Sequence, residues 1–325
     1  MVVALLLLFA GFVSFIAAQP CIPAAGKTAL VIGQDYGSIL NYTKGGFGHA
    51  KPFGSMTYIS LRTFAGLEEP TDYGSGIQWA GGLSEHYPGS SIQVGLWLVG
   101  DTKKVITGVY DQSIAKLVNY MGSTNEQYYL RIGYEFDSVS NNYPVDRYKK
   151  AFRYIVNSFR AANVSNVTFV WHASGFQPRD GYNHMSWFPG VEYVDWCGVS
   201  LFQQPYDVEL MQYADDFADL CKSHNLPLML AESTPFGGIL DEAAARKDPE
   251  TTNRAGYADS TWSRWFVPVL KYIQRHDVRM WSYINCDWDA QPMWAKLHAP
   301  GVYWGDSRVQ GKYTIFHLYT QSSYL

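Results

Sequence analysis

Eight short apolar runs, separated by polar or amphipathic segments, constrain the fold of this 325-residue chain more than any other feature. Most of these runs are rich in β-branched and aromatic residues, and each reads as a strand that is buried on both faces, as in parallel sheets. The runs span residues 28–33, 56–63, 92–100, 128–135, 167–173, 194–202, 226–232 and 278–285.

Helical patterns lie in the intervals between these runs. The clearest covers 145–163, where apolar residues recur every three to four positions and basic residues occupy the other faces. Similar patterns cover 111–122, 209–225 and 260–277. Strand and helix in alternation through eight units predict an α/β fold of the (β/α)8 TIM-barrel type. A doubly wound open sheet is the alternative, but no GxGxxG follows the first strand, so a dinucleotide-binding version has little support.

The N-terminus resembles a secretory signal peptide. Its apolar stretch ends in the small residues Ala17 and Ala18, directly before Gln19 and Pro20. An uncleaved membrane anchor is the alternative, although the apolar run is short for a span. We therefore predict a signal peptide over 1–18, a single barrel domain over 19–325 and a secreted, extracellular protein.

Cysteines and glycosylation sequons fit an exported chain. The four cysteines stand at positions 21, 197, 221 and 286. Secretion permits two disulfide bonds with three possible connectivities, and Cys197 and Cys221 lie on neighbouring predicted elements. Sequons that would make the protein a glycoprotein begin at Asn41, Asn163 and Asn166.

Composition narrows the class of ligand. Aromatic residues make up 16% of the chain and charged residues only 17%, which favours clefts that bind neutral, ring-shaped ligands. The net charge of −4 gives no support for nucleic acid as a partner. There is no CxxC motif and no Cys/His cluster, so we predict no metal site and no cofactor. We also expect a monomer that does not associate with a membrane once the signal peptide is cleaved.

Two glutamates stand out at the strand ends, where barrels of this type carry their chemistry. Glu135 ends the fourth predicted strand and Glu232 ends the seventh. Two carboxyl groups at one barrel mouth are what glycosidic cleavage requires: one donates a proton to the leaving oxygen and the other attacks the anomeric carbon or activates water. The competing interpretation of each residue is a strand-end glutamate paired with a surface arginine or lysine.

The surroundings of the two glutamates in the sequence predict different roles. Glu135 lies between Tyr134 and Phe136, so desolvation is expected to raise its pKa and keep it protonated. Glu232 precedes Ser233 and Thr234, whose hydrogen bonds are expected to keep it ionised. These environments predict Glu135 as the acid/base and Glu232 as the nucleophile.

Several segments resemble glycoside hydrolase family 26, a family of retaining (β/α)8-barrel glycosidases best known for β-mannanases. The resemblance covers roughly residues 28–290 and is carried by LRIGYEFD, NVTFVW, FPGVEYVDWCGVSLF and FADLCKSHNLPLMLAES. It implies catalytic glutamates after strands four and seven, and it matches Arg131 to an arginine of the family's strand-four motif. Two positions depart from the family pattern: Tyr134 replaces the usual histidine before the acid, and Phe202 stands near the place of a strand-six tyrosine. Tyr206 and Tyr283 are candidates to replace that tyrosine.

Substrate-binding candidates follow from the strand ends and from the resemblance. Sugar rings pack their C–H faces on aromatic rings, so Trp281 on strand eight is the best candidate for a platform. Of the neighbours Trp171 and His172, one should face the cleft, because consecutive strand residues point to opposite sides. The full set of predicted binding residues is Asp35, Tyr36, Arg131, Tyr134, Trp171, His172, Phe202, Trp281 and Tyr283.

The sequence therefore predicts a secreted retaining glycoside hydrolase that is endo-acting on a β-linked polysaccharide such as mannan, mixed-linkage glucan or a xylan-like chain. The alternative is a secreted glycan-binding protein on a barrel scaffold with little or no turnover. The two readings differ in whether the carboxyl groups of Glu135 and Glu232 approach to about 5–5.5 Å, the spacing of a retaining pair. A third possibility is an inverting or transglycosylating enzyme that uses the same pair, and a separation of roughly 6.5–9.5 Å would favour inversion.

Overall fold

The computed structural model describes residues 22–44, 52–178, 181–239, 261–294 and 303–311. The predicted signal peptide, Cys21 and the ends of the predicted barrel domain lie outside these ranges. Within them, no helix is both long and apolar enough to cross a membrane.

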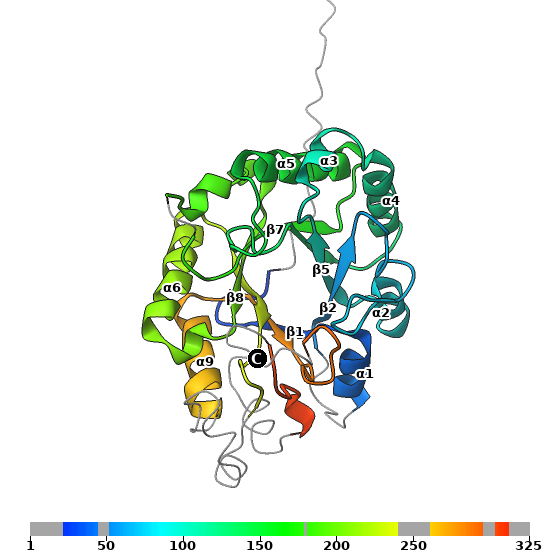
Figure 1. Cartoon of the computed structure of the whole chain (residues 1–325). Coiled ribbons are helices and arrows are strands. Elements are labelled where there is room, and N and C mark those ends of the chain that lie inside the picture. The colour runs from blue at the N-terminus through cyan, green and yellow to red at the C-terminus, as the bar shows by residue number, and fades with distance from the viewer. Residues whose placement is uncertain (1–21, 45–51, 179–180, 240–260, 295–302, 312–325) are drawn as a thin grey trace, which may run out of the picture.

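Eight parallel strands form a closed barrel, which confirms the predicted TIM-barrel fold (Figure 1). The strands follow one another around the barrel in chain order, and the last pairs with the first. Their bounds are β1 Ala29–Gly33, β2 Gly54–Ser60, β5 Ser91–Trp97, β6 Tyr128–Ile132, β7 Val167–Ala173, β8 Trp196–Leu201, β9 Leu228–Ser233 and β10 Met280–Ile284. Each corresponds to one of the eight predicted runs. A short hairpin of β3 (Thr71–Asp72) and β4 (Ile77–Gln78) stands outside the barrel.

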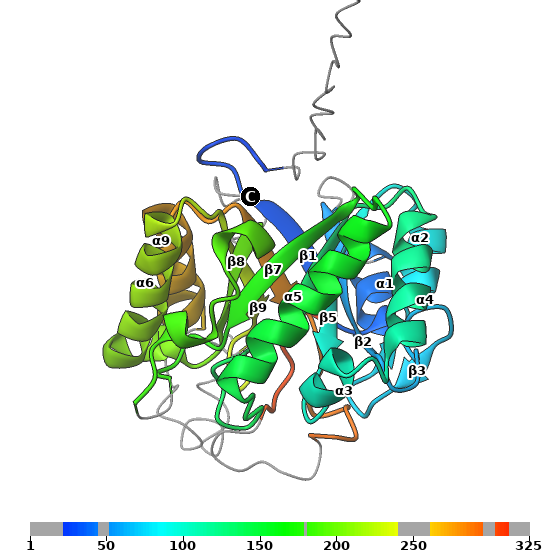
Figure 2. The same ribbon diagram turned by 90° about the horizontal axis from the view of Figure 1, so that it is seen from above.

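Helices surround the strands, as Figures 1 and 2 show. The α-helices are α1 Tyr36–Lys44, α2 Ala80–His86, α3 Thr102–Ile106, α4 Asp111–Gly122, α5 Val145–Ala161, α6 Val208–Ser223 and α9 Val267–Arg275. A π-helical turn, Trp262–Phe266, leads into α9, and single 3-10 turns cover His184–Trp187, Val191–Tyr193, Gln204–Tyr206 and Val309–Gly311. The four predicted helices correspond to α4, α5, α6 and the unit ending in α9. The sequence patterns missed α1, α2 and α3, which are short and weakly periodic.

Alternation along the strands divides the core into two layers. On β6, Tyr128, Leu130 and Ile132 join the layer between strands and helices. Tyr129, from the same strand, belongs instead to the cluster inside the barrel. Arg131 shares this alternation with Tyr129 and is completely buried. A charged side chain inside the barrel requires a partner, and that partner defines the candidate site.

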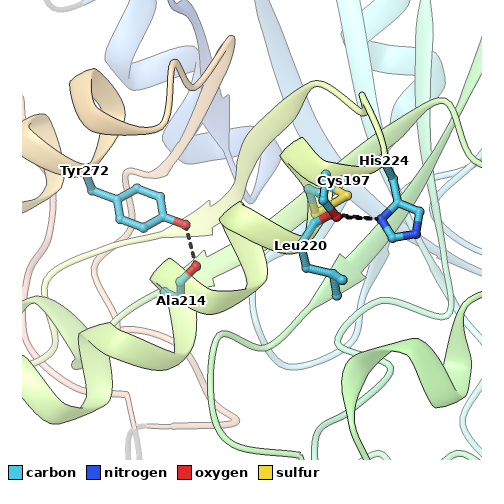
Figure 3. Close-up of a disulfide and its surroundings, with 7 residues drawn as sticks. Cys197, Ala214, Leu220, His224 and Tyr272 are labelled. Carbon is cyan, nitrogen blue, oxygen red and sulfur yellow. Dashed lines mark hydrogen bonds between the residues drawn. A yellow bond between two sulfur atoms is a disulfide. The ribbon is translucent and has the colours of Figure 1, made fainter.

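A disulfide bond ties a barrel strand to the helix that follows it. Cys197 on β8 is bonded to Cys221 on α6, with the Cα atoms 6.2 Å apart (Figure 3). Of the connectivities left open by the sequence, this one joins the neighbouring elements. Beside it, the Tyr272 hydroxyl donates to the Ala214 carbonyl at 2.9 Å and ties α9 to α6. Cys286 is buried and has no disulfide partner among the described residues, from which Cys21 is missing.

Candidate active site

Glu135 and Glu232 lie at the carboxyl end of the barrel. Glu135 follows β6, the fourth barrel strand, and Glu232 is the fifth residue of β9, the seventh. Both strand assignments agree with the sequence prediction. Glu135 lies within range of the charge of Glu232, which together with the larger effect of burial raises the pKa of Glu135.

A sharp turn aims Glu135 back over the barrel mouth. Gly133 and Glu135 both have left-handed backbone conformations, with φ of 59° and 49°. For Glu135 this conformation costs about 1–2 kcal/mol, because its Cβ approaches the following carbonyl. The next residue secures the turn: the Phe136 amide donates to the His172 carbonyl at 3.1 Å, and its ring stacks on Trp171 at 4.6 Å. Asn141 donates to the Glu135 carbonyl from the other side.

An irregularity in the sheet brings Glu232 to the inside of the barrel. Val199 pairs with Leu230, but the next residue, Ser200, pairs with Glu232, so β9 contains one extra residue at this point. Leu230 belongs to the outer layer. In a regular strand Glu232 would follow Leu230 to that side. The bulge re-aims the side chain and places it beside Ser200.

Arg131 is the partner of Glu232. Its Nη1 donates to Glu232 Oε1, and the guanidinium is completely buried. Two tyrosine rings flank the cation, Tyr58 with its centroid at 5.0 Å and Tyr134 at 5.3 Å. Although burial opposes it, the charge of Glu232 raises the pKa of Arg131. The Arg131 guanidinium thus places a permanent positive charge against the Glu232 carboxylate, the arrangement that suits a nucleophile.

Glu135 is partly buried at the barrel mouth, and no cation is bonded to it among the described residues. Burial, followed by the charge of Glu232, raises its pKa from an ordinary 4.5 to about 8. The Ser200 hydroxyl donates to Glu135 Oε1 at 2.8 Å and opposes that rise. A carboxyl group with a pKa near 8 is protonated at neutral pH, as a general acid must be.

His172 lies between the two glutamates inside the barrel. Its Nε2 is 2.9 Å from Ser200 Oγ and its Nδ1 is 3.3 Å from Arg131 Nη1. Burial and the neighbouring Arg131 lower the pKa of this imidazole well below its ordinary value, so the ring is neutral. The expectation that one residue of the Trp171–His172 pair faces inward therefore applies to His172.

Three predicted binding residues point away from the mouth. Trp171 packs in the outer layer against Phe136 and Phe217. Trp281 is completely buried in the same layer, where its Nε1 donates to Ser233 Oγ at 2.7 Å. Tyr283 donates to the Ser307 carbonyl at 2.6 Å and is not available to replace the strand-six tyrosine. The face of β10 that carries Trp281 and Tyr283 is turned toward the helices.

The remaining predicted residues lie around the rim or inside the mouth. Asp35 is buried and caps α1 by accepting from the Ser38 amide, while its Oδ2 has no hydrogen-bond partner among the described residues. The Tyr36 hydroxyl lies 3.0 Å from His86 Nδ1. Phe202 is buried inside the barrel, with its ring 4.8 Å from that of Tyr303. Tyr206 donates to the Phe236 carbonyl instead of reaching the glutamates.

Sequence reasoning missed Tyr58, Ser200 and Tyr303. Tyr58 and Ser200 lie near the carboxyl ends of β2 and β8, and this position was the only sequence feature that pointed to a role at the barrel mouth. Tyr303 follows the eighth strand by 19 residues and gave none. Burial and the charges of Glu135 and Glu232 raise the pKa of Tyr303, so its hydroxyl lies within range of both carboxyl groups.

Other surface features do not compete with this site. A hollow of about 550 Å³ on the outer face of α4 is lined by residues such as Lys116 and Asn119, with no pair of strand-end carboxylates. No group of three or more metal-ligating side chains occurs within the described ranges.

Comparison with known proteins agrees with this geometry. The model of glycosyl hydrolase family 26 matches residues 136–279. The chain is 33% identical to the β-1,3-xylanase TXYA of a Vibrio species and 32% identical to a β-1,3-xylanase of an Alcaligenes species, each over 86% of this chain. It spans about three fifths of the length of these relatives, 61% and 60%.

Solved structures share the barrel at low sequence identity. The family 26 β-mannanase BoMan26A of Bacteroides ovatus superposes with a TM-score of 0.58 at 13% identity, over 91% of this chain and 89% of that one. The catalytic domain of an endo-β-1,4-mannanase from Bacillus sp. JAMB-750 gives a TM-score of 0.57 at 14% identity, over 90% and 86%. These likenesses concern the fold. Together with the family match and the curated relatives, they show that this chain is a member of glycosyl hydrolase family 26.

Proposed function

We propose that this chain is a retaining glycoside hydrolase that cleaves a β-linked polysaccharide internally, with Glu135 as acid/base and Glu232 as nucleophile. The observation that carries the proposal is the contrast at the barrel mouth: Glu232 is bonded to buried Arg131, whereas Glu135 is desolvated and bonded to a neutral hydroxyl. Double displacement needs one carboxylate stabilised as an anion and one carboxyl group of raised pKa.

Each step of the reaction has a residue to perform it. Glu232 attacks the anomeric carbon while protonated Glu135 donates to the departing glycosidic oxygen. Glu135, now ionised, then deprotonates the water that hydrolyses the glycosyl-enzyme intermediate. Tyr58, Tyr134 and Tyr303, whose pKa values are all raised by burial and by the charge of Glu232, supply neutral hydroxyls for orienting a sugar ring.

The proposed substrate class is a β-linked glycan, and β-1,3-linked xylan is the first candidate. The two curated relatives are named as β-1,3-xylanases. Tyr134 and Phe202 depart from the family's mannanase pattern, which argues against mannan. Asp35 Oδ2, buried without a partner among the described residues, is a candidate acceptor for a sugar hydroxyl.

A reducing-end release screen tests this function. Wild-type protein and the Glu232→Ala variant are assayed on β-1,3-xylan, β-1,4-xylan, mannan, mixed-linkage glucan and β-1,3-glucan. Turnover that is lost in the variant supports the hydrolase and names its substrate class, and proton NMR of the first product tests for retained configuration. Retention on one glycan without turnover would instead support a binding protein on a barrel scaffold.

We also propose that the chain is secreted as a glycoprotein. The leader-like sequence over 1–18 and the Cys197–Cys221 disulfide support export. Asn41 and Asn163 are exposed, whereas the Asn166 amide donates to the carbonyls of Met121, Thr124 and Glu126. N-terminal sequencing should find Gln19 first, and glycopeptide mapping should find glycans on Asn41 and Asn163 but not on Asn166. A retained leader or a glycan on Asn166 would contradict these expectations.

A further inference from the structure

An unbroken chain of hydrogen bonds connects the two glutamates through the inside of the barrel. It runs from Glu232 Oε1 to Arg131 Nη1, to His172 Nδ1 at 3.3 Å, from His172 Nε2 to Ser200 Oγ at 2.9 Å, and from there to Glu135 Oε1 at 2.8 Å. Arg131, His172 and Ser200 are all completely buried. They stand on three consecutive barrel strands, β6, β7 and β8.

The direction of every hydrogen bond in this chain is fixed by chemistry. A guanidinium only donates, and Nη1 of Arg131 has two hydrogens, one for Glu232 and one for His172. His172 Nδ1 must therefore accept, which places the proton of the neutral ring on Nε2. Nε2–H then donates to Ser200 Oγ, and the Ser200 hydroxyl hydrogen is directed at Glu135.

This direction assigns the two oxygens of Glu135. Oε1 accepts from Ser200, so it is not the oxygen that holds the proton of the acid. We propose that Ser200 and His172 are positioning residues that occupy Oε1 of Glu135, so that the transferable proton resides on Oε2. The inference rests on the proposed function for its catalytic meaning, but the hydrogen-bond chain itself does not depend on turnover.

The same hydrogen-bond chain affects the pKa of Glu135, together with the charged groups around it. The charged groups whose influence reaches Glu135 are Glu232, Asp137 and Arg131, and the titratable tyrosines are Tyr134, Tyr143 and Tyr303. The two carboxylates oppose ionisation of Glu135, whereas the hydrogen bond from Ser200 favours it. Removing that bond should therefore raise the pKa of Glu135 further.

The first test is a titration that needs no substrate. Protein labelled with 13C at the glutamate carboxyl groups is titrated by NMR, and the Glu135→Gln variant identifies the Glu135 signal. Ser200→Ala should move the Glu135 midpoint upward by about one pH unit, the size expected for a hydrogen bond to an ionised group. Ser200→Thr, which keeps the hydroxyl, should restore the midpoint. His172→Leu should shift it in the same direction by a smaller amount.

A matched control is Ser282→Ala, which removes another completely buried barrel hydroxyl, one that donates to Gln93 at 2.6 Å instead of to a glutamate. In the Ser282→Ala variant, the titration midpoint of Glu135 should equal that of the wild type. An unchanged midpoint in Ser200→Ala, or equal shifts in Ser200→Ala and Ser282→Ala, would overturn the proposal.

The second test separates positioning from folding by the leaving group. Ser200→Ala should lower kcat on the unactivated glycan by about tenfold, a fraction of the total effect of general acid catalysis. It should leave kcat on an aryl glycoside with an activated leaving group within twofold, because that group departs without a proton. Equal losses on both substrates would overturn the positioning role. If the wild type hydrolyses nothing, the proposed function fails, and the titration still decides whether the hydrogen-bond chain exists.

Discussion

The two sides of the barrel mouth use the same side chain in opposite ways. At the end of β9, Glu232 is bonded to a buried cation, and this pair keeps a negative charge inside the barrel. At the end of β6, Glu135 has a hydroxyl as its hydrogen-bond partner, and burial raises its pKa to about 8. The residue type is identical, so the difference in proposed role comes from the hydrogen-bond partner of each carboxyl group.

The comparison teaches that the second carboxylate is part of the environment of the first. The charge of Glu232 raises the pKa of Glu135, after burial itself. The charge of Arg131 acts to lower the pKa of Glu135, but Arg131 is bonded to Glu232. A single guanidinium that is bonded to one carboxyl group and not to the other therefore distinguishes the two sites.

The largest expected effect is the loss of hydrolysis when either glutamate is truncated. Glu135→Ala and Glu232→Ala should each lower kcat/KM on unactivated glycan by at least about 10³-fold, because each removes an entire chemical role. Azide should restore cleavage of an activated aryl glycoside in both variants, with opposite outcomes. It should give a glycosyl azide of retained configuration with Glu135→Ala and of inverted configuration with Glu232→Ala. Products of the same configuration from both variants would break the assignment of roles.

The next largest effect is a change in the free energy of unfolding when either glutamate is replaced by glutamine, and its sign is opposite at the two sites. Glu232→Gln leaves Arg131 buried without its anionic partner and should destabilise the fold by roughly 3 kcal/mol. Urea denaturation at pH 7 measures this loss. The double variant with Arg131→Met, which removes both charges, should recover most of the stability. A fully stable Glu232→Gln single variant would show that the ion pair does not hold the site together.

Glu135→Gln should stabilise the protein at alkaline pH. The pKa of Glu135 is raised from 4.5 to about 8 on folding, so its contribution to stability is fully present below about pH 4.5 and is lost as the pH rises through 8. A glutamine has no proton to lose, so the variant should melt roughly 2–5 °C higher than the wild type at pH 8.5 and at the same temperature at pH 4. A lower melting temperature at pH 8.5 would contradict the raised pKa.

The smallest effect is expected at Trp281, which sequence reasoning placed at the cleavage point. The structure buries Trp281 in the layer between strands and helices, with its indole bonded to Ser233. Trp281→Phe should therefore change KM on the glycan by less than about twofold, while lowering the melting temperature through lost packing. Tyr134→Ala, which removes a ring that flanks Arg131, is the matched variant and should raise KM several-fold. A large KM effect at Trp281 with normal stability would restore its predicted role.

The sequence alone determined the barrel and the place of both glutamates in it. Eight apolar runs with helical intervals leave few other arrangements, because strands buried on both faces need helices around them. Strand order then puts Glu135 after the fourth strand and Glu232 near the end of the seventh. The raised pKa of Glu135 agrees in direction with the sequence prediction, although the ring of its neighbour Phe136 packs on Trp171 in the outer layer.

The tertiary structure decided which way the side chains point. Strict alternation would send Glu232 to the same side as Leu230, and only the bulge opposite Ser200 brings it inward. Alternation also left open which way Trp281 and Tyr283 point, and the structure places both in the outer layer between strands and helices. Ser200, Arg131 and His172 are far apart in the chain, and they meet because three parallel strands are adjacent in the barrel. The periodicity of the sequence predicts that a side chain is buried. The hydrogen-bond partner that determines its protonation state depends on contacts between strands, which periodicity does not predict.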